Sequence, residues 1–378
     1  MKHSKEVNEM KSLLLYIGMF IVVLVIAISM YGCLSKYKIR VKVTEKYYVK
    51  GLDMKILAII ILPVMIAGIR FYVGVDYGSY ENMFFLVRAG QALDFEIAYI
   101  ALNKLIGIFT GNFMAVTIVV AFITYYLAVK SIIQLCGEDK KSIPFVIWFY
   151  FLTMFPASLN IMRQTIAVSI VMYGLTFIIK KKYWKYVLCV VCATLFHSSA
   201  FICLIFVLFN HNILSIKKFS IFLVTFCGCL LLATNPSILN AVIANTPIIN
   251  RYITHEMSSN YIFWKNFIVV IPYFVVLLWY RKLENHNKEN LVFLNLMLFE
   301  LILMILAIQY QWAFRMISYT TMAKYILLPQ FIKLFHGKKV RIALTAGYMI
   351  FGLLMFIYGV YFGNMNGIFP YRTRRGGL

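Results

Sequence analysis

Charged side chains are scarce in this 378-residue sequence: Asp, Glu, Lys and Arg make up 13% of it, whereas 62% of the residues are hydrophobic. No soluble domain could bury so much apolar area, so the composition indicates an integral membrane protein. Acidic residues are the scarcest, with 14 Asp and Glu against 37 Lys and Arg. The segments predicted below to be external contain no Asp-x-Asp pair and no cluster with metal-ligand spacing. We therefore expect neither a metal nor a cofactor.

A further absence narrows the class of partners. The sequence has no RNP, zinc-finger or basic-helix pattern, so its basic excess does not indicate nucleic acid as a partner. Lysine-rich cytoplasmic loops explain most of that excess. The seven cysteines lie mostly in apolar runs, where a thiol behaves as a small hydrophobe.

Apolar runs long enough to cross a membrane recur along the whole chain. Candidate spans lie at about 12–31, 55–71, 112–130, 143–159, 161–179, 219–234, 267–280, 291–308, 316–332 and 342–362. The segment 184–210 is either one tilted helix or two short helices that meet near His197. The predicted fold class is an all-α integral membrane protein, a polytopic bundle of about 11–12 transmembrane helices forming a single domain over residues 1–378.

Lysines predict the orientation of this bundle. Basic loops lie at 36–55, 130–141, 180–185, 217–218, 281–282 and 338–341. Counting crossings places the first three on one side, which the positive-inside rule makes cytoplasmic. The last three join them only if 184–210 crosses twice, and this favours twelve spans with both termini outside. The external face then carries the segments 70–111 and 235–266.

Within the first external segment, apolar and polar residues alternate at helical spacing. One face carries Phe95, Tyr99, Leu102, Ile106 and Phe109, and the other carries Asp94, Glu96, Asn103 and Lys104. This pattern predicts an amphipathic helix that lies either on the external membrane surface or against the protein itself.

The stretch Arg70–Tyr80 follows an apolar run where that run leaves the membrane. It reads RFYVGVDYGSY and so combines a guanidinium, a carboxylate, tyrosines and glycines. This is the chemistry of a polar, anion-handling site at a membrane surface. Its three tyrosines are candidates for stacking against sugars.

A second polar cluster opens the span at 161–179. We expect Asn160 to cap this helix after a Phe-Pro turn at 155–156, with Arg163 and Gln164 in the first helical turn. Unpaired backbone N–H groups and a guanidinium at a helix N-terminus suit a pyrophosphate. The alternative is an arginine that snorkels to the interface.

Four more ionisable residues complete the candidates. His197 lies at the middle of 184–210; it is either a neutral general base or a packed, hydrogen-bonded histidine. Arg315, four residues before Tyr319, opens a later span, and Arg251 lies in the loop 235–266. Arginine suits diphosphate better than lysine because its planar fork is bidentate. Glu300 lies inside the run 291–308, where a carboxylate indicates a functional site, an ion pair or a protonated group.

Four of these patterns together resemble the EpsG family, membrane proteins that polymerise lipid-linked repeat units of bacterial exopolysaccharides. They are R-x3-G-x-D-x3-Y at Arg70–Tyr80, N-x-x-R-Q at Asn160–Gln164, H-x-S-A at His197–Ala200, and Arg315 with Tyr319. The family usually has a small hydroxyl residue where this chain has Val75, so any hydrogen bond of that hydroxyl is absent here.

The resemblance implies a glycosyltransferase of the EpsG or Wzy kind with a GT-C-like fold, whose active site faces outward from the bacterial cytoplasmic membrane. The implied substrates are undecaprenyl-diphosphate-linked glycans; membrane lipids and a chain-length regulator protein are the further partners. His197 would be the general base, and Asp76 the alternative base or the group that orients the acceptor. The groups expected to bind substrate are Arg70, Tyr80, Asn160, Arg163, Gln164, Arg251, Arg315 and Tyr319.

Two other functions remain open at this point. A transporter of lipid-linked oligosaccharide should line a central pathway with charged residues, for which Glu300 is the best argument. A membrane acyltransferase should pair an embedded histidine with an acyl-donor tunnel from the cytoplasm. The polymerase hypothesis predicts that Arg70, Asp76, Arg163, His197 and Arg315 face one external cavity.

Overall fold

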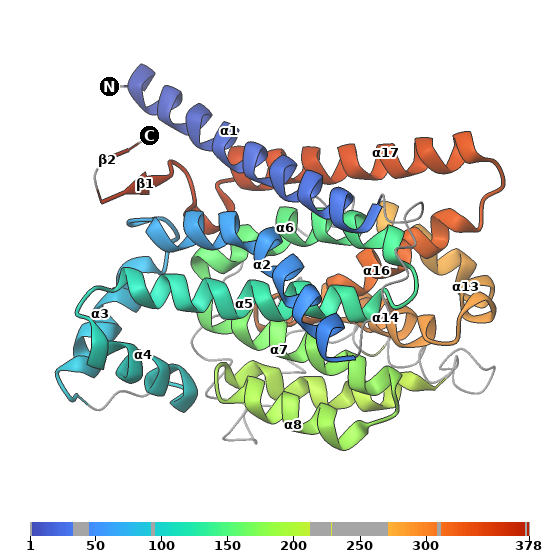
Figure 1. The fold of residues 1–378 in the computed structure, drawn as a ribbon, viewed down its shortest axis with the longest axis horizontal. Helices are drawn as coiled ribbons and strands as arrows, with labels where there is room; N and C mark the ends of the chain where they lie inside the picture. Colours follow the sequence, from blue (N-terminus) through green and yellow to red (C-terminus); the bar gives the residue numbers. More distant parts are fainter. Residues whose placement is uncertain are drawn as a thin grey trace. The chain divides into compact units, whose positions relative to one another are not determined.

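The computed structural model describes residues 2–32, 45–91, 95–211, 228, 271–307, 311–374 and 376–377 (Figure 1). Helices dominate this part of the chain; its only strands are the two-residue pair β1 (Arg372–Thr373) and β2 (Gly376–Gly377). Five described helical stretches are long and apolar enough to cross a membrane: Glu6–Gly32, Met114–Leu135, Lys140–Asn160, Met162–Ile179 and Lys338–Phe362. The prediction of an all-α polytopic membrane protein is confirmed.

The described helices follow one another along the chain. They are α1 (Lys2–Ala27), η1 (Ile28–Gly32), α2 (Glu45–Ile69), α3 (Tyr77–Arg88), α4 (Ile97–Phe109), α5 (Met114–Leu135), η2 (Lys140–Ser142), α6 (Ile143–Asn160), α7 (Met162–Ile179), α8 (Tyr183–Thr194), η3 (Ser198–Asn210), η4 (Val275–Trp279), α13 (Tyr280–His286), α14 (Asn290–Leu306), α15 (Gln311–Thr320), α16 (Met322–Lys333), α17 (Lys338–Phe356), η5 (Ile357–Phe362) and η6 (Met365–Gly367). Most of the predicted span 219–234 and the whole loop 235–266, with Arg251, lie outside the described residues.

The chain divides into two compact units. The first comprises Met1–Thr176, Val187–Phe201 and Gly337–Leu378, and the second comprises Phe177–Tyr186 and Ile202–His336. The single domain expected over 1–378 stays a prediction.

Helix α6 forms the centre of the first unit. Its aromatic side chains are buried around most of its circumference, which is typical of a helix enclosed by other helices. Helices α1, α2, α5 and α17 contact it. Phe20 of α1 touches Phe155 of α6 and Phe356 of α17, with ring centroids 5.9 and 5.0 Å apart. Aromatic edge contacts of this kind hold the apolar core together.

The prediction of a turn at Phe155-Pro156 is wrong. Pro156 lies inside α6, and the chain breaks instead at Ile161, between α6 and α7. The N–H of Ile161 still donates to the carbonyl of Ala157, at 2.8 Å. The break therefore sits at the very end of α6, which leaves Asn160 at a helix C-terminus and not at an N-cap.

The segment 184–210 folds as a helical hairpin with its turn at His197. It consists of α8 and the 3-10 helix η3. The Tyr186 hydroxyl donates to the carbonyl of Cys203 at 2.6 Å, and Asn210 donates to the Tyr183 hydroxyl at 3.1 Å. These contacts align the two arms antiparallel, so of the two predicted alternatives the structure has the pair of short helices.

Helix α4 has its faces arranged differently from the prediction. Tyr99, Asn103 and Ile106 are buried, although Asn103 was expected on the polar face, and α3 and α5 pack against this helix. Ile108 and Phe109 are exposed. Packing against neighbouring helices decides the buried face here, and the apolar outer face is free to meet lipid.

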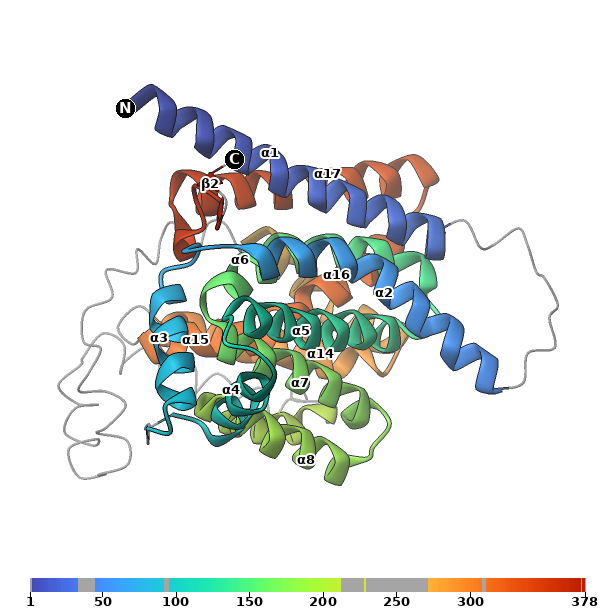
Figure 2. The same ribbon diagram turned by 60° about the vertical axis from the view of Figure 1, so that its left-hand side comes forward.

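The C-terminal segment after η5 folds back onto the loop that follows α2. The backbone N–H groups of Phe71, Gly74 and Val75 donate to the carbonyls of Arg372, Gly367 and Asn366, at 2.8, 3.0 and 3.3 Å. The N–H of Tyr371 donates to the Ser12 hydroxyl of α1 at 2.9 Å. Both views place the C-terminus beside α1 (Figures 1 and 2). The C-terminal segment thus packs against α1 within this unit.

In the second unit, α14 is buried on nearly all sides and contacts α13, α15 and α16. Glu300 of α14 forms an ion pair with Lys324 of α16, and both side chains are almost fully buried. The predicted span 316–332 is instead two helices, α15 and α16, that meet at Thr321. The hydroxyls of Thr320 and Thr321 both donate to the Ile317 carbonyl, which competes with the helical ladder there.

Candidate functional site

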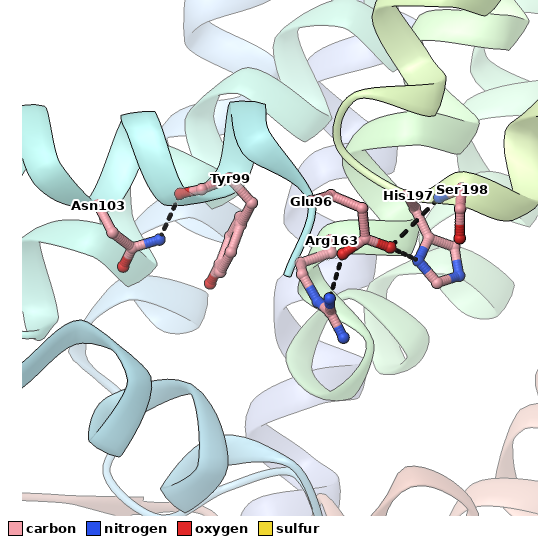
Figure 3. A network of polar contacts seen from close by, with 6 residues as sticks. All are labelled: Glu96, Tyr99, Asn103, Arg163, His197 and Ser198. Carbon is pink, nitrogen blue, oxygen red and sulfur yellow. Dashed lines mark hydrogen bonds and ion pairs between the residues drawn. The ribbon is translucent and has the colours of Figure 1, made fainter. Parts of the chain in front are cut away.

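Glu96 lies between Arg163 and His197 in the first unit (Figure 3). Its Oε2 forms an ion pair with Arg163 Nη1. Its Oε1 lies 3.1 Å from His197 Nδ1 and accepts the backbone N–H of Ser198 at 3.2 Å. The three side chains come from the start of α4, the first turn of α7 and the turn after α8. Each side chain is 15–20% exposed, so the network is sheltered and still reachable.

The carboxylate of Glu96 defines the tautomer of His197. An ionised carboxylate can only accept hydrogen bonds, so the facing Nδ1 must carry the proton. The neutral ring then presents Nε2 as an acceptor. This arrangement provides an oriented base, as in other sites where a carboxylate holds a histidine.

Glu96 is held in its ionised form. Burial alone raises the pKa of this carboxyl, but the hydrogen bond with His197 and the positive charge of Arg163 outweigh burial and lower it to about 2. Glu96 therefore carries its charge at any pH near neutrality.

Two aromatic rings surround the Arg163 guanidinium. It lies 4.7 Å from the ring centroid of Phe95 and 5.7 Å from that of Tyr80. The cation–π contacts and the ion pair with Glu96 together fix the orientation of the Arg163 guanidinium. Arg163 Nε is buried and has no hydrogen-bond partner among the described residues. Part of its donor capacity is therefore unused.

Asn160 does not cap α7, contrary to the prediction. Its Oδ1 accepts the backbone N–H of Asp76 at 2.9 Å. The reason is the position of the chain break: Asn160 ends α6, so its side chain turns to the neighbouring loop and not to the start of α7. The contact joins Asp76, which precedes α3, to the turn that carries Arg163.

Arg70 lies in the interior and not on an open surface. Its side chain is almost fully buried, and its guanidinium donates to the carbonyls of Ala67, Val73 and Leu159. A guanidinium engaged with three carbonyls stabilises the protein and offers few donors to a substrate. The placement favours a structural role over the expected diphosphate contact.

The other predicted residues are distributed as follows. Tyr80 and Gln164 are buried in the first unit, at 7% and 3% exposure, and Tyr80 makes an edge contact with the Tyr99 ring. Arg315 and Tyr319 lie on α15 of the second unit, Arg315 exposed and Tyr319 buried. Their part in a shared site stays a prediction. The described residues contain no group of three or more His, Cys, Asp or Glu that could hold a metal ion.

Sequence reasoning missed Glu96 as a site residue. Glu96 was assigned to the polar face of a surface helix, and its partners lie 67 and 101 positions away. The signal that could have found it is its rarity: few of the 14 acidic residues precede an apolar helix on the predicted external side.

Comparison with known proteins gives one match. The family model of the EpsG family matches residues 54–373, which is most of the chain and includes every residue of the network. No curated protein and no solved structure matches the chain. The matched range contains all four patterns that carried the resemblance in the sequence. The chain therefore belongs to the EpsG family of membrane proteins related to Wzy-like polysaccharide polymerases.

Proposed function

We propose that this protein is a polysaccharide polymerase, a glycosyltransferase that joins undecaprenyl-diphosphate-linked repeat units on the outer face of the bacterial cytoplasmic membrane. The single observation that carries the proposal is the Glu96–Arg163–His197 network, in which an oriented base lies beside a guanidinium. Family membership supports a role in polysaccharide biosynthesis. A GT-C-like fold and an outward-facing site are part of the same proposal.

In the proposed reaction, His197 Nε2 accepts the proton of an acceptor sugar hydroxyl. The resulting oxygen nucleophile forms a bond to the anomeric carbon of the donor glycan. The bond from that carbon to the lipid diphosphate breaks, and undecaprenyl diphosphate leaves with the electron pair. Glu96 stabilises the imidazolium that forms, because its negative charge lies on the Nδ1 side of the ring.

Arg163 is the group best placed to bind the leaving diphosphate. It lies in the first turn of α7, where backbone N–H groups also favour an anion. Only Nη1 contacts Glu96, and Nε has no partner among the described residues. When diphosphate charge develops, a cation beside the bond being broken lowers the barrier. Asp76, half-buried and tied to Asn160 through its backbone, stays the candidate for orienting the acceptor.

The transporter alternative depended on Glu300 as an unexplained intramembrane carboxylate. Lys324 pairs with it, so the charge has a structural partner. The acyltransferase alternative needs a histidine reached by an acyl donor from the cytoplasm, whereas His197 lies in the network with Arg163. The polymerase is thus the function that the described residues support best.

The experiment is in vitro polymerisation. Purified protein in nanodiscs receives lipid-linked repeat units from its source strain, with a chelator and no nucleotide, and products are resolved as a glycan ladder. We expect a ladder from the wild type and none from His197→Ala or Arg163→Ala. Matched controls are His286→Ala and Arg341→Ala, which remove exposed side chains elsewhere.

Two results would contradict the proposal. One is a ladder of normal length from folded His197→Ala protein. The other is movement of labelled lipid-linked glycan across a sealed bilayer with no bond formed, which would replace the polymerase with a transporter.

A further inference from the structure

Tyr72 has an unusual backbone conformation. Its φ is +50°, in the left-handed region that a bulky side chain rarely adopts. Its side chain is also 56% exposed, so burial of the ring does not explain the conformation. Strain of this kind costs about 1–3 kcal/mol and persists only where the surrounding structure enforces it.

Contacts on both sides enforce it here. Arg70 Nε donates to the carbonyl of Val73 at 3.3 Å, and the C-terminal segment accepts the N–H groups of Phe71 and Gly74. Tyr72 lies between these fixed points. The loop is therefore built to hold the Tyr72 ring in one position at the surface.

The ring is part of an aromatic cluster of which it is the accessible member. Its centroid lies 4.9 Å from that of Phe71 and 5.3 Å from that of Tyr77. Tyr77 is 1% exposed, so it supports the cluster from below and cannot itself meet a ligand. A Cβ added at Gly78 would lie 3.5 Å from the Tyr72 ring, which shows that the ring lies over this glycine.

An ion pair borders the cluster. The Arg374 guanidinium lies 5.6 Å from the Phe71 ring centroid, and its Nη2 is 3.5 Å from Glu81 Oε1. The Arg374 side chain is 48% exposed, so donors for hydroxyl groups lie at the surface beside the rings, and the Glu81 carboxylate, 13% exposed, lies beneath them as an acceptor. Arg374 belongs to the same C-terminal segment that holds the loop.

We infer that Tyr72, Phe71, Arg374 and Glu81 form a saccharide-binding subsite for a pyranose ring of the glycan, which rests on the proposed function. The apolar face of a pyranose packs on the Tyr72 ring, and its hydroxyls bond to Arg374 and Glu81. Helix α3 connects this subsite to the reaction network, because it begins beside Tyr72 and carries Tyr80 under Arg163. A glycan chain bound at the network would reach the subsite with a sugar beyond the reacting one.

An interfacial anchor is the alternative explanation for an exposed tyrosine. Tyr358, 50% exposed on the helix η5, has that character, and it needs no strained backbone. Tyr72 differs because its conformation is imposed by contacts from two directions. An anchor gains nothing from such a constraint, whereas a binding surface gains a preformed geometry.

Direct binding tests the subsite without requiring catalysis. The probe is a set of oligosaccharides of one to three repeat units, released by partial acid hydrolysis of the polysaccharide that the source strain secretes. Binding to the full-length protein in nanodiscs is measured by calorimetry, and unfolding by a thermal shift. We expect Tyr72→Gly to weaken binding about tenfold and Tyr72→Trp to keep it within about threefold.

Tyr72→Gly is informative because glycine suits a φ of +50°. Its unfolding temperature should equal or exceed that of the wild type, so weaker binding cannot reflect misfolding. Arg374→Gln should weaken binding about threefold, and Tyr358→Ala is the matched control that should leave it unchanged.

The outcomes separate the subsite from the proposed reaction. Oligosaccharide binding that is lost in Tyr72→Gly supports the subsite even if no ladder forms. Wild-type binding by Tyr72→Gly, or no binding by the wild type, overturns the subsite even if polymerisation succeeds.

Discussion

The side chain of Asn160 accepts the backbone N–H of Asp76 at 2.9 Å, although 84 positions separate them. The contact joins the two polar patterns that the sequence places at the ends of different helices. Arg70 reinforces the junction by donating to the carbonyl of Leu159, at 3.3 Å. These residues fix the loop 70–76 against the turn that precedes Arg163, so part of the family pattern makes contacts that join two segments far apart in the sequence.

Gly74 should be intolerant of any side chain. Its φ is +99°, and a Cβ there would lie 2.2 Å from the carbonyl oxygen of Leu159. We expect Gly74→Ala to lower the free energy of unfolding by about 3 kcal/mol or more, since the strain of a positive φ adds to the clash with the Leu159 carbonyl. Gly90→Ala is the matched control: φ is +78° but the space is open, so the cost should be about 1 kcal/mol. Thermal unfolding in detergent measures both, and equal costs would contradict the proposed close approach.

Arg70→Lys should behave as a stability variant. One ammonium group cannot replace a fork that reaches the carbonyls of Ala67, Val73 and Leu159. Each buried carbonyl left unpaired costs about 1–3 kcal/mol, so the unfolding temperature should fall well below that of Arg341→Lys, which changes an exposed arginine. If Arg70→Lys is as stable as the wild type and only its affinity for the lipid-linked donor falls, the result would support the original prediction that Arg70 binds the diphosphate.

Sequence patterns identified the membrane class and the polar patterns because both depend on residues close together along the chain. Apolar runs locate α5, α6 and α7 within a few residues. His197 was placed correctly at the turn between two short helices. The pairing of α8 with η3 was left as one of two alternatives, since length alone cannot decide it.

Long-range contacts could not be predicted in this way. Glu96, Arg163 and His197 are brought together only by the packing of α4, α7 and α8, which no local period records. The C-terminal segment is similar: its backbone pairing with Phe71 and Gly74 spans about 300 residues and leaves no side-chain signature. The misplaced cap at Asn160 has a local cause, because Pro156 is tolerated within α6 and moves the break by several residues.

Glu96 should make the protein sensitive to acid in a defined direction. Because its folded pKa is lowered from about 4.5 to about 2, its stabilising contribution is present above pH 4.5 and is lost as the pH falls toward 2. Glu96→Gln should lower the free energy of unfolding by about 2 kcal/mol at pH 7. Between pH 5 and 3, the variant should lose less of its stability than the wild type does, because it has no carboxylate to protonate at this position. Thermal unfolding across this range measures the difference.

The same variant separates structure from chemistry. A glutamine at position 96 can also donate, so it no longer requires the proton to lie on His197 Nδ1. We expect polymerisation by Glu96→Gln to fall about 100-fold or more even at temperatures where it is folded. Glu289→Gln, which changes an exposed carboxylate, is the control. An acid response of Glu96→Gln identical to that of the wild type would argue against the network.

The Glu300–Lys324 pair should be replaceable only as a unit. Both side chains are at most 5% exposed, and Glu300 Oε2 has no hydrogen-bond partner among the described residues. Removing one partner leaves an uncompensated buried charge, so Glu300→Met or Lys324→Met should each cost about 3–5 kcal/mol. The free energy of unfolding of the double variant should lie within about 1 kcal/mol of the wild-type value, because two apolar side chains leave no charge buried.

The pair of Lys288 and Glu284 provides the comparison, since Lys288 is 74% exposed and its charge stays hydrated. Lys288→Met should cost no more than about 0.5 kcal/mol. The decisive measurement is the glycan ladder from the double variant of Glu300 and Lys324. A ladder of normal length would show that the buried charges take no part in the reaction. A folded double variant that forms no ladder would instead mean that the proposed reaction depends on these charges, and would reopen the transporter alternative.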